Sequence, residues 1–257
     1  MTIPVGLLIV FGSMTLAVGG LILVQRLVPI DVRRQHNDVA GFIYAVLGVT
    51  YAVLLGLMVV AVWEQWNTAG HTVDDEASSL AEIFWIAERL PESNRLRVQE
   101  LARSYARVVV DEEWPLMKQG KSSPKAWDLL DEIRTNLQSF KPSTPQEQVL
   151  YEQSLEQMRG LADARRDRLI EAEQGLPVIL WLVLVTGGVV VVGFTYLFGL
   201  QSTAIHLLMV ASLAMIIALV IFTVAALNFP FGGDITIKPE AMEQVLRRFD
   251  TSELGEM

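Results

Sequence analysis

The chain has 257 residues, of which 52% are hydrophobic, a formal net charge of −9 and no cysteine. This hydrophobic share exceeds that of ordinary soluble domains and indicates a membrane protein. The lack of cysteine excludes disulfides, thiolate metal sites and cysteine nucleophiles. The acidic balance argues against nucleic acid as a partner, because the phosphate backbone attracts basic surfaces.

Four stretches without Asp, Glu, Lys or Arg predict membrane-spanning helices: residues 3–24, 39–63, 176–200 and 203–227. About 20 residues suffice to cross the roughly 30 Å hydrocarbon core of a bilayer, and each stretch is at least that long. An ionisable side chain inside the core costs several kcal/mol, so the absence of charge supports the prediction. The N-terminal part, residues 1–63, therefore holds helices 1 and 2, and residues 176–227 hold helices 3 and 4.

Residues 64–175, between the second and third spans, are expected to form a helical domain. Apolar residues recur there at helical spacing, and the second span continues as one rod from about 39 to 90. A further helix is expected from about 93 to 118, ending at Gly120. Ser123 with Pro124 predicts the start of a third helix, and Thr144 with Glu147 forms a capping-box pattern that starts a fourth. The fold class is therefore all-α, with residues 228–257 as a tail.

The number of spans places both termini and the central domain on the same side of the membrane. Basic residues near the membrane ends on that side are Arg165, Arg166, Arg168, Lys238, Arg247 and Arg248. Those on the opposite side are Arg26, Arg33 and Arg34. Because basic residues favour the cytoplasm, we expect a multi-pass protein of the cell membrane with a cytoplasmic central domain and the lipid bilayer as a partner.

No residue pattern typical of catalysis is found, so the sequence predicts neither an enzyme nor a cofactor. His71 with Asp74, Asp75 and Glu76 has the ligand types of a divalent-metal site, but a solvated acidic turn is the preferred interpretation and no metal is expected. The run from Asp111 to Pro115 is similarly interpreted as exposed acids, a packing tryptophan and a helix-ending proline.

Small residues recur every three or four positions along the second span, at Gly41, Ala45, Gly48, Ala52 and Gly56. Such a stripe lets membrane helices pack closely, which is the favoured interpretation. It also suits the wall of a pore, because small side chains leave a lumen open. In that case the pore-lining residues would be Tyr44, Gly48, Tyr51, Ala52, Leu55 and Gly56.

The second span ends in the sequence Trp63-Glu64-Gln65-Trp66. Tryptophans at the end of a span anchor it at the membrane surface, and we expect this role for Trp63 and Trp66. Glu64 lies about 80° around the helix from Gly56, beside the stripe of small residues. It either belongs to the same interface or contributes to a ring of carboxylates at a pore mouth, which would favour cations.

Four segments in chain order resemble the bestrophin-like domain family: YAVLLGLMVVAVWEQW (51–66), DDEASSL (74–80), LARSYARVVVDEEWP (101–115) and NFPFGGDITIKPE (228–240). More distantly the chain is similar to bestrophin channels. That resemblance implies a homo-oligomer, a pentamer in bestrophins, whose second span lines a pore for small ions. The alternative is a non-conducting membrane scaffold or sensor whose acidic helical domain docks a partner.

Bestrophins carry an Asn-Pro-Phe-Gly motif after the fourth span, followed by an acidic run that holds calcium. The matching residues here are Asn228, Pro230, Phe231, Gly232 and Asp234, with one phenylalanine inserted after the asparagine. Asp234 alone remains of the acidic run. Because calcium takes six to eight oxygen ligands, the resemblance does not carry a calcium site into this chain.

Overall fold

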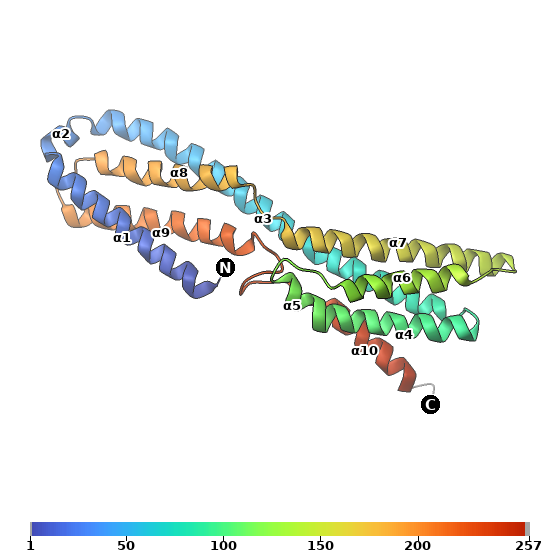
Figure 1. The fold of residues 1–257 in the computed structure, drawn as a ribbon. Helices are drawn as coiled ribbons and strands as arrows, with labels where there is room; N and C mark the ends of the chain where they lie inside the picture. The colour runs from blue at the N-terminus through green and yellow to red at the C-terminus, as the bar shows by residue number, and fades with distance from the viewer. Residues whose placement is uncertain (1, 255–257) are drawn as a thin grey trace. The chain divides into compact units, whose positions relative to one another are not determined.

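The computed structural model describes residues 2–254, and every regular element in that part of the chain is helical (Figure 1). The elements are α1 (Ile3–Leu27), α2 (Ile30–Arg34), α3 (Asn37–Ala87), α4 (Glu92–Val108), the π-helix η1 (Val109–Glu113), α5 (Trp114–Met117), α6 (Pro124–Ser139), α7 (Pro145–Glu173), α8 (Val178–Phe194), the 3-10 helix η2 (Thr195–Leu197), α9 (Thr203–Leu227) and α10 (Glu240–Leu254). The predicted rod of the second span is confirmed as α3, a single helix of 51 residues.

Two compact units make up the chain. Unit 1 comprises residues 1–65, 175–228 and 233–235, and unit 2 comprises residues 66–174, 229–232 and 236–257. Four helical stretches are long and apolar enough to cross a membrane: Ile3–Leu27, Asn37–Ala87, Pro145–Leu197 and Thr203–Leu227. The apolar parts of all four belong to unit 1.

Within unit 1, α1 runs beside α9, and α3 lies along α8 (Figure 1). Buried side chains of α3, α8 and α9 form one apolar cluster. The contact of α1 with α9 is built on Ala17, Leu21, Val210 and Ala214. The loops at one end are tied by hydrogen bonds: the Asn37 side chain donates to the Gly199 carbonyl (3.1 Å) and accepts from the Gly199 N–H (3.0 Å). A Cβ at position 199 would lie 2.6 Å from the Arg34 nitrogen, so this turn requires glycine.

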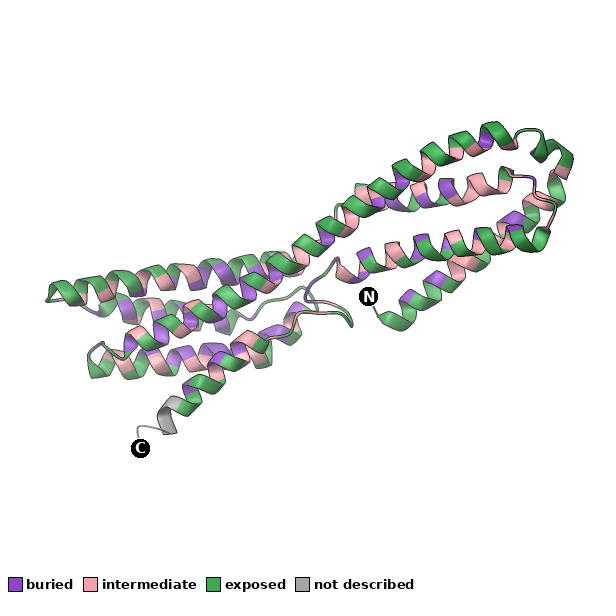
Figure 2. Ribbon diagram, turned by 180° about the vertical axis from the view of Figure 1, so that it is seen from behind, coloured by how far each residue is buried: buried purple, intermediate pink, exposed green. Residues whose placement is uncertain are grey.

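Unit 2 is a helical bundle with a continuous apolar core, and purple buried positions recur along its helices in Figure 2. The core residues expected from helical spacing are confirmed as buried: Leu80, Ile83, Phe84, Ala87, Leu90, Val98, Leu101, Tyr105, Val108, Val109, Leu130, Ile133, Leu137 and Phe140. The C-terminal helix α10 adds Phe249, whose ring stacks on Phe84 at 3.9 Å between centroids.

Three details of the predicted helix ends are tested by the structure. The capping box is confirmed, because the Thr144 side chain accepts from the Glu147 N–H and the Glu147 carboxylate accepts from the Thr144 N–H. The helix expected over 93–118 is interrupted by the π-helix η1, and Pro115 lies in the first turn of α5 where a helix end was expected. The Ser123 side chain makes no capping hydrogen bond, and its backbone N–H donates to Glu113.

Candidate pore helix and a buried charge cluster

The membrane half of α3 has one face that is buried inside unit 1. Tyr51 is buried, and its hydroxyl donates to the Leu184 carbonyl of α8 at 2.8 Å. Its ring fills the space beside Gly187, where an added Cβ would lie 2.6 Å away. Leu55 is buried in the same apolar cluster, and the Tyr44 ring stacks near Phe194. Tyr51 and Leu55 therefore support α8 and α9 with their side chains.

The stripe of small residues on α3 does not pack against another helix of the chain. An added Cβ at Gly41, Gly48 or Gly56 would meet no atom within 4 Å, and Ala52 is exposed. The stripe is therefore not packed within the chain, and its use in helix packing stays a prediction. The physical reason is rotation: α3 turns the neighbouring Tyr51–Leu55 face toward α8, and the stripe lies beside that face.

An exposed apolar surface continues from this stripe to Glu64. Val53, Leu57 and Val60 have 58%, 59% and 61% of their surface exposed, and they precede Glu64 by 11, 7 and 4 residues. This spacing places them on the same side of the helix as Glu64, whose side chain is also exposed. The outer side of the span is therefore uncharged along its length and ends in a carboxylate.

The two tryptophans beside Glu64 differ in exposure. Trp63 has 55% of its surface exposed, whereas Trp66 is partly buried. An exposed indole at the end of an apolar helix suits the boundary between hydrocarbon and water, so the geometry is compatible with an anchoring role for Trp63.

The motif after α9 holds two helix ends of unit 1 by hydrogen bonds. Asn228 is buried, and its side-chain oxygen accepts from the Leu176 N–H at 2.7 Å. Asp234 accepts from the Ile3 N–H at 2.7 Å, at the positive N-terminal end of α1. Both side chains act here as local caps for backbone N–H groups.

The middle of the motif belongs to unit 2 and forms a tight turn. The Gly232 N–H donates to the Phe229 carbonyl at 3.0 Å, and the Pro230 carbonyl accepts from Ile237 at 2.8 Å. Phe231 is buried against the Trp114 ring at 5.7 Å. No group of three or more His, Asp or Glu that could hold a metal ion occurs within the described residues.

Unit 2 also contains a cluster of four fully buried charges, Glu76, Glu113, Arg165 and Arg168, called here the charge cluster. Arg165 binds both oxygens of Glu113 through its two terminal nitrogens, at 2.6 and 2.7 Å. Arg168 donates to Glu113 at 2.8 Å and makes two hydrogen bonds to Glu76. The four charges sum to zero, and the hydrogen bonds between them join α3, η1 and α7.

Aromatic and polar groups enclose the charge cluster. The Arg165 guanidinium lies 4.6 Å from the centre of the Trp127 ring, and that of Arg168 lies 5.2 Å from the Trp114 ring. The Tyr105 hydroxyl donates to Glu76 at 2.7 Å. Burial, together with the Glu76 charge, raises the pKa of Tyr105 well above its ordinary value, so the phenol stays protonated as a donor.

The charge balance of the cluster keeps Arg168 ionised. Burial alone would lower the pKa of the Arg168 guanidinium, but the attraction and hydrogen bonds of Glu76 outweigh burial and raise it above its ordinary value. Buried charges persist in this way only when they are paired and hydrogen-bonded, since an isolated one costs several kcal/mol.

Sequence reasoning missed this cluster. His71, Asp74 and Asp75 are exposed, as a solvated turn predicts, but Glu76 is fully buried. Glu113, interpreted as one of a run of exposed acids, is buried too. A signal was available: Glu76 shares its helix face with Val73, Ala77 and Leu80, and a charge inside an apolar face needs a buried partner.

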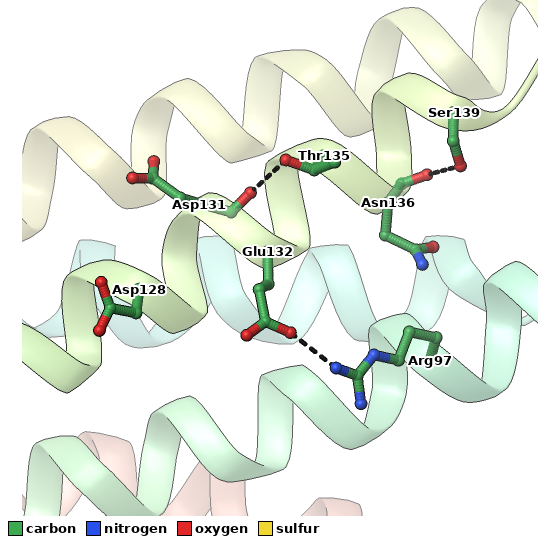
Figure 3. Close-up of a pocket in the computed structure, with 7 residues that line it drawn as sticks. All are labelled: Arg97, Asp128, Asp131, Glu132, Thr135, Asn136 and Ser139. Carbon is green, nitrogen blue, oxygen red and sulfur yellow. Dashed lines mark hydrogen bonds and ion pairs between the residues drawn. The ribbon is translucent and has the colours of Figure 1, made fainter.

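A surface hollow of about 530 Å³ lies between α4 and α6 of unit 2 (Figure 3). Its lining is mainly acidic and polar: Arg97, Asp128, Asp131, Glu132, Thr135, Asn136 and Ser139. Arg97 is held by Glu132 at 2.6 Å, and both side chains remain about half exposed. Asp128 and Asp131 leave the hollow with a net negative charge.

Comparison with known proteins gives a consistent result. The model of the Bestrophin-like domain matches residues 11–242. Two crystal structures of variants of a bacterial bestrophin homologue from Klebsiella pneumoniae superpose with TM-scores of 0.68 and 0.67, at 13% and 14% identity. They cover 94% and 93% of this chain and 97% of their own. A structure of that homologue solved by zinc phasing superposes with a TM-score of 0.64 at 14% identity. It covers 93% of this chain and 96% of its own. No curated protein matches.

Proposed function

The chain belongs to the bestrophin-like domain family, and on that premise we propose that it is an oligomeric ion channel of the cell membrane with α3 lining the pore. In this proposal the four apolar stretches are four spans, and both termini and residues 64–175 are cytoplasmic. A pentamer is the stoichiometry that the resemblance to bestrophins favours. The fold that the chain shares with the bacterial bestrophin homologues supports the proposal.

The observation that carries the proposal is the uncovered side of α3. Its free arc runs from Ala52 through Gly56 and Val60 to Glu64, which is about 120° of the helix circumference at 100° per residue. Several copies of such a helix around an axis would form an uncharged constriction. Within the predicted pore-lining set, Gly48, Ala52 and Gly56 then face the lumen, while Tyr51 and Leu55 brace α3 from behind.

Small cations are the ions that this arrangement favours. The first ionisable side chain at the end of the apolar arc is Glu64, and repeated copies would place a ring of carboxylates at the pore mouth. Asp74 and Asp75 follow on the exposed surface of the same helix, and the negative field would concentrate cations at the mouth.

Ion flux through liposomes containing the purified protein tests the proposal. Glu64→Gln should lower the preference for cations over anions while flux continues, because the ring would lose its charge. Glu156→Gln, an exposed carboxylate on α7, is the matched control and should leave the preference unchanged. Protein that passes no small ion over a range of salts and pH would contradict the channel.

The acidic hollow between α4 and α6 favours a second candidate, a non-conducting scaffold whose helical domain docks a basic partner. The oligomeric state separates the two functions. A ring with α3 nearest the symmetry axis supports the channel, whereas a monomer or dimer with the spans in a closed bundle supports the scaffold.

A further inference from the structure

Unit 1 contains a second hollow, which borders the apolar cluster that α3 shares with α8 and α9. It has a volume of about 610 Å³ and is walled by α1, α8 and α9. Its lining includes Leu16, Trp181, Val185, Val192, Tyr196 and Ile221. The volume falls in the range of about 300–1,000 Å³ that is usual for small-molecule sites.

The chemistry of the lining calls for a hydrocarbon occupant. No Asp, Glu, Lys, Arg or His lines the hollow. Its side-chain polar groups are the Trp181 indole N–H, the Tyr196 hydroxyl and the Ser13 hydroxyl, which is already bonded to the Ile9 carbonyl of its own helix. Water is not stabilised in such a place, because it needs two to four polar partners. An unfilled hollow would forgo the dispersion contacts of its lining atoms. An apolar chain needs no polar partners and makes dispersion contacts with the lining atoms.

The hollow, of about 610 Å³, is too small to enclose a helix from a second copy. A helix is 10–12 Å across with its side chains, so three turns of one occupy more than about 1,000 Å³. A single flexible acyl chain is thin enough to enter. The lining of the hollow on α8 and η2 runs from Trp181 to Tyr196, which are 15 positions apart in the chain.

The charges of unit 1 distinguish the two ends of this hollow. Tyr196 belongs to η2, and Phe198 follows η2 directly. The Phe198 carbonyl accepts a hydrogen bond from Arg33 at 3.2 Å. Arg26 and Arg34 lie in the same connecting region, residues 25–40. The three arginines and two aspartates of this region, Asp31 and Asp38, give it a net charge of +1. The Arg33 side chain is 93% buried, yet its Nε has no hydrogen-bond partner within the described residues.

The opposite end of unit 1 is acidic. Glu64 ends the apolar part of α3, and Asp234 lies at the first residue of α1. Trp181 lies in the first turn of α8, five residues after Leu176, whose N–H donates to Asn228 at the end of α9, so Trp181 lies at the end of unit 1 that carries the motif after α9. An amphipathic ligand with a negative head is therefore favoured in one direction, with the head at the arginine end.

We propose that this hollow binds one acyl chain of an anionic phospholipid, with the phosphate at the end that carries Arg26, Arg33 and Arg34. The chain lies along Val185 and Val192, and the headgroup meets the arginines beyond Tyr196. The site does not depend on ion conduction, so it stands or falls independently of the channel proposal.

Retention of lipid by the full chain tests the site. The protein is reconstituted in nanodiscs of equal phosphatidylglycerol and phosphatidylcholine, re-extracted in detergent, washed, and measured by native mass spectrometry. Gly193 lines the hollow and an added Cβ there meets no atom within 4 Å, so Gly193→Leu fills the space without a backbone clash. The matched control is Gly19→Leu, at an exposed position that is equally free of neighbours.

The expected result is at least one retained lipid per chain, mainly phosphatidylglycerol, in the wild type and in Gly19→Leu. Gly193→Leu should lower retention about tenfold, which corresponds to about 1.4 kcal/mol. Equal retention in both variants, or none in the wild type, would overturn the site. The variant Gly193→Cys would carry the single cysteine of the chain. A crosslink between two copies through it would show that a second subunit covers the hollow, and this would overturn the lipid site.

Two further measurements keep the test independent of folding. Phosphatidylglycerol with brominated acyl chains should quench the fluorescence of Trp181, and the Trp181→Phe variant should lose that part of the quenching. The double variant Arg26→Gln and Arg34→Gln alters exposed side chains only. It should retain lipid but lose the preference for phosphatidylglycerol, and a preserved preference would refute the headgroup assignment.

Discussion

Unit 1 and unit 2 are both all-helical, yet their polar side chains find partners in different ways. In unit 1, the hydroxyls of Ser13, Thr15 and Thr50 donate to carbonyls four residues earlier in their own helices. In unit 2, the charge cluster joins three helices, and the ion pairs found among the described residues all lie in this unit. Bonds between helices also occur in unit 1, as from the Tyr51 hydroxyl to the Leu184 carbonyl, but this one joins an uncharged side chain to a backbone group. A charge in hydrocarbon is costly, so ion pairs between helices suit the unit that lies outside the apolar stretches.

The comparison also concerns the source of stability. Apolar burial does not drive helices together in a bilayer, because lipid is as apolar as the side chains, so unit 1 depends on close fits such as Tyr51 beside Gly187. Unit 2 has a large apolar core in water and encloses four charges within it. Removing one such contact in either unit, and comparing it with a substitution at a residue that lacks the contact, separates the two sources of stability.

The largest effect is expected at the charge cluster. Arg165→Met leaves the Glu113 carboxylate without its bidentate partner, and breaking such a buried pair costs about 3–5 kcal/mol. Arg166→Met alters the next residue, whose exposed pair with Asp163 contributes about 0–1 kcal/mol. Thermal unfolding of the full chain, followed by circular dichroism, measures both. Equal melting midpoints for the two variants would contradict a stabilising role of the cluster.

How far the sequence predicted this molecule depends on the kind of signal. Uncharged stretches and helical spacing predicted the helices of both units, because each depends only on residues close in the chain. The pairing of Glu113 with Arg165 spans 52 residues and also needs the π-helix η1, for which no local pattern was recognised. No sequence signal indicated that Tyr51 packs against α8, since hydrophobicity is similar all round a membrane helix.

A second, smaller effect is expected in unit 1, where two leucines of α3 separate packing from pore function. Leu55→Ala should lower the free energy of unfolding by about 2 kcal/mol, the low end for buried leucines, because its side chain packs in the core with α8 and α9. Leu57→Ala should have little effect on stability, since that side chain is 59% exposed. Melting midpoints in detergent measure both, and ion flux adds a second readout. If Leu57→Ala proved the more destabilising, the proposed outward face of α3 would be wrong.

The capping box of α7 gives an effect of about 1 kcal/mol in unit 2. Thr144→Ala removes the acceptor for the Glu147 N–H, and loss of an N-cap side chain typically costs this amount. Thr135→Ala is the control, because Thr135 lies within α6 and bonds only to the carbonyl four residues earlier. The control should be neutral or slightly stabilising, since alanine favours helix. Hydrogen exchange at the start of α7 should increase in the first variant alone.

The smallest effect is expected at Glu171, a half-buried carboxylate that contrasts with the paired charges of the cluster. Its Oε1 accepts from the Thr72 hydroxyl at 3.1 Å, but its buried Oε2 has no partner within the described residues. Burial raises the pKa of the Glu171 carboxyl, Thr72 lowers it in part, and the charge of Asp167 raises it again. The folded chain therefore binds a proton more tightly there than the unfolded chain, and stability falls as the pH rises through the raised pKa.

Glu171→Gln removes the loss of stability at high pH, because the amide is neutral and its oxygen can still accept from Thr72. The variant should melt slightly higher than the wild type at pH 8, and the two should converge below the ordinary carboxyl range near pH 4. Asp167→Asn should give a smaller shift in the same direction, since it removes the repelling charge but leaves the burial. A lower melting midpoint for Glu171→Gln at pH 8 would show that the folded chain supplies this carboxylate with a cationic partner, and the contrast with the charge cluster would then disappear.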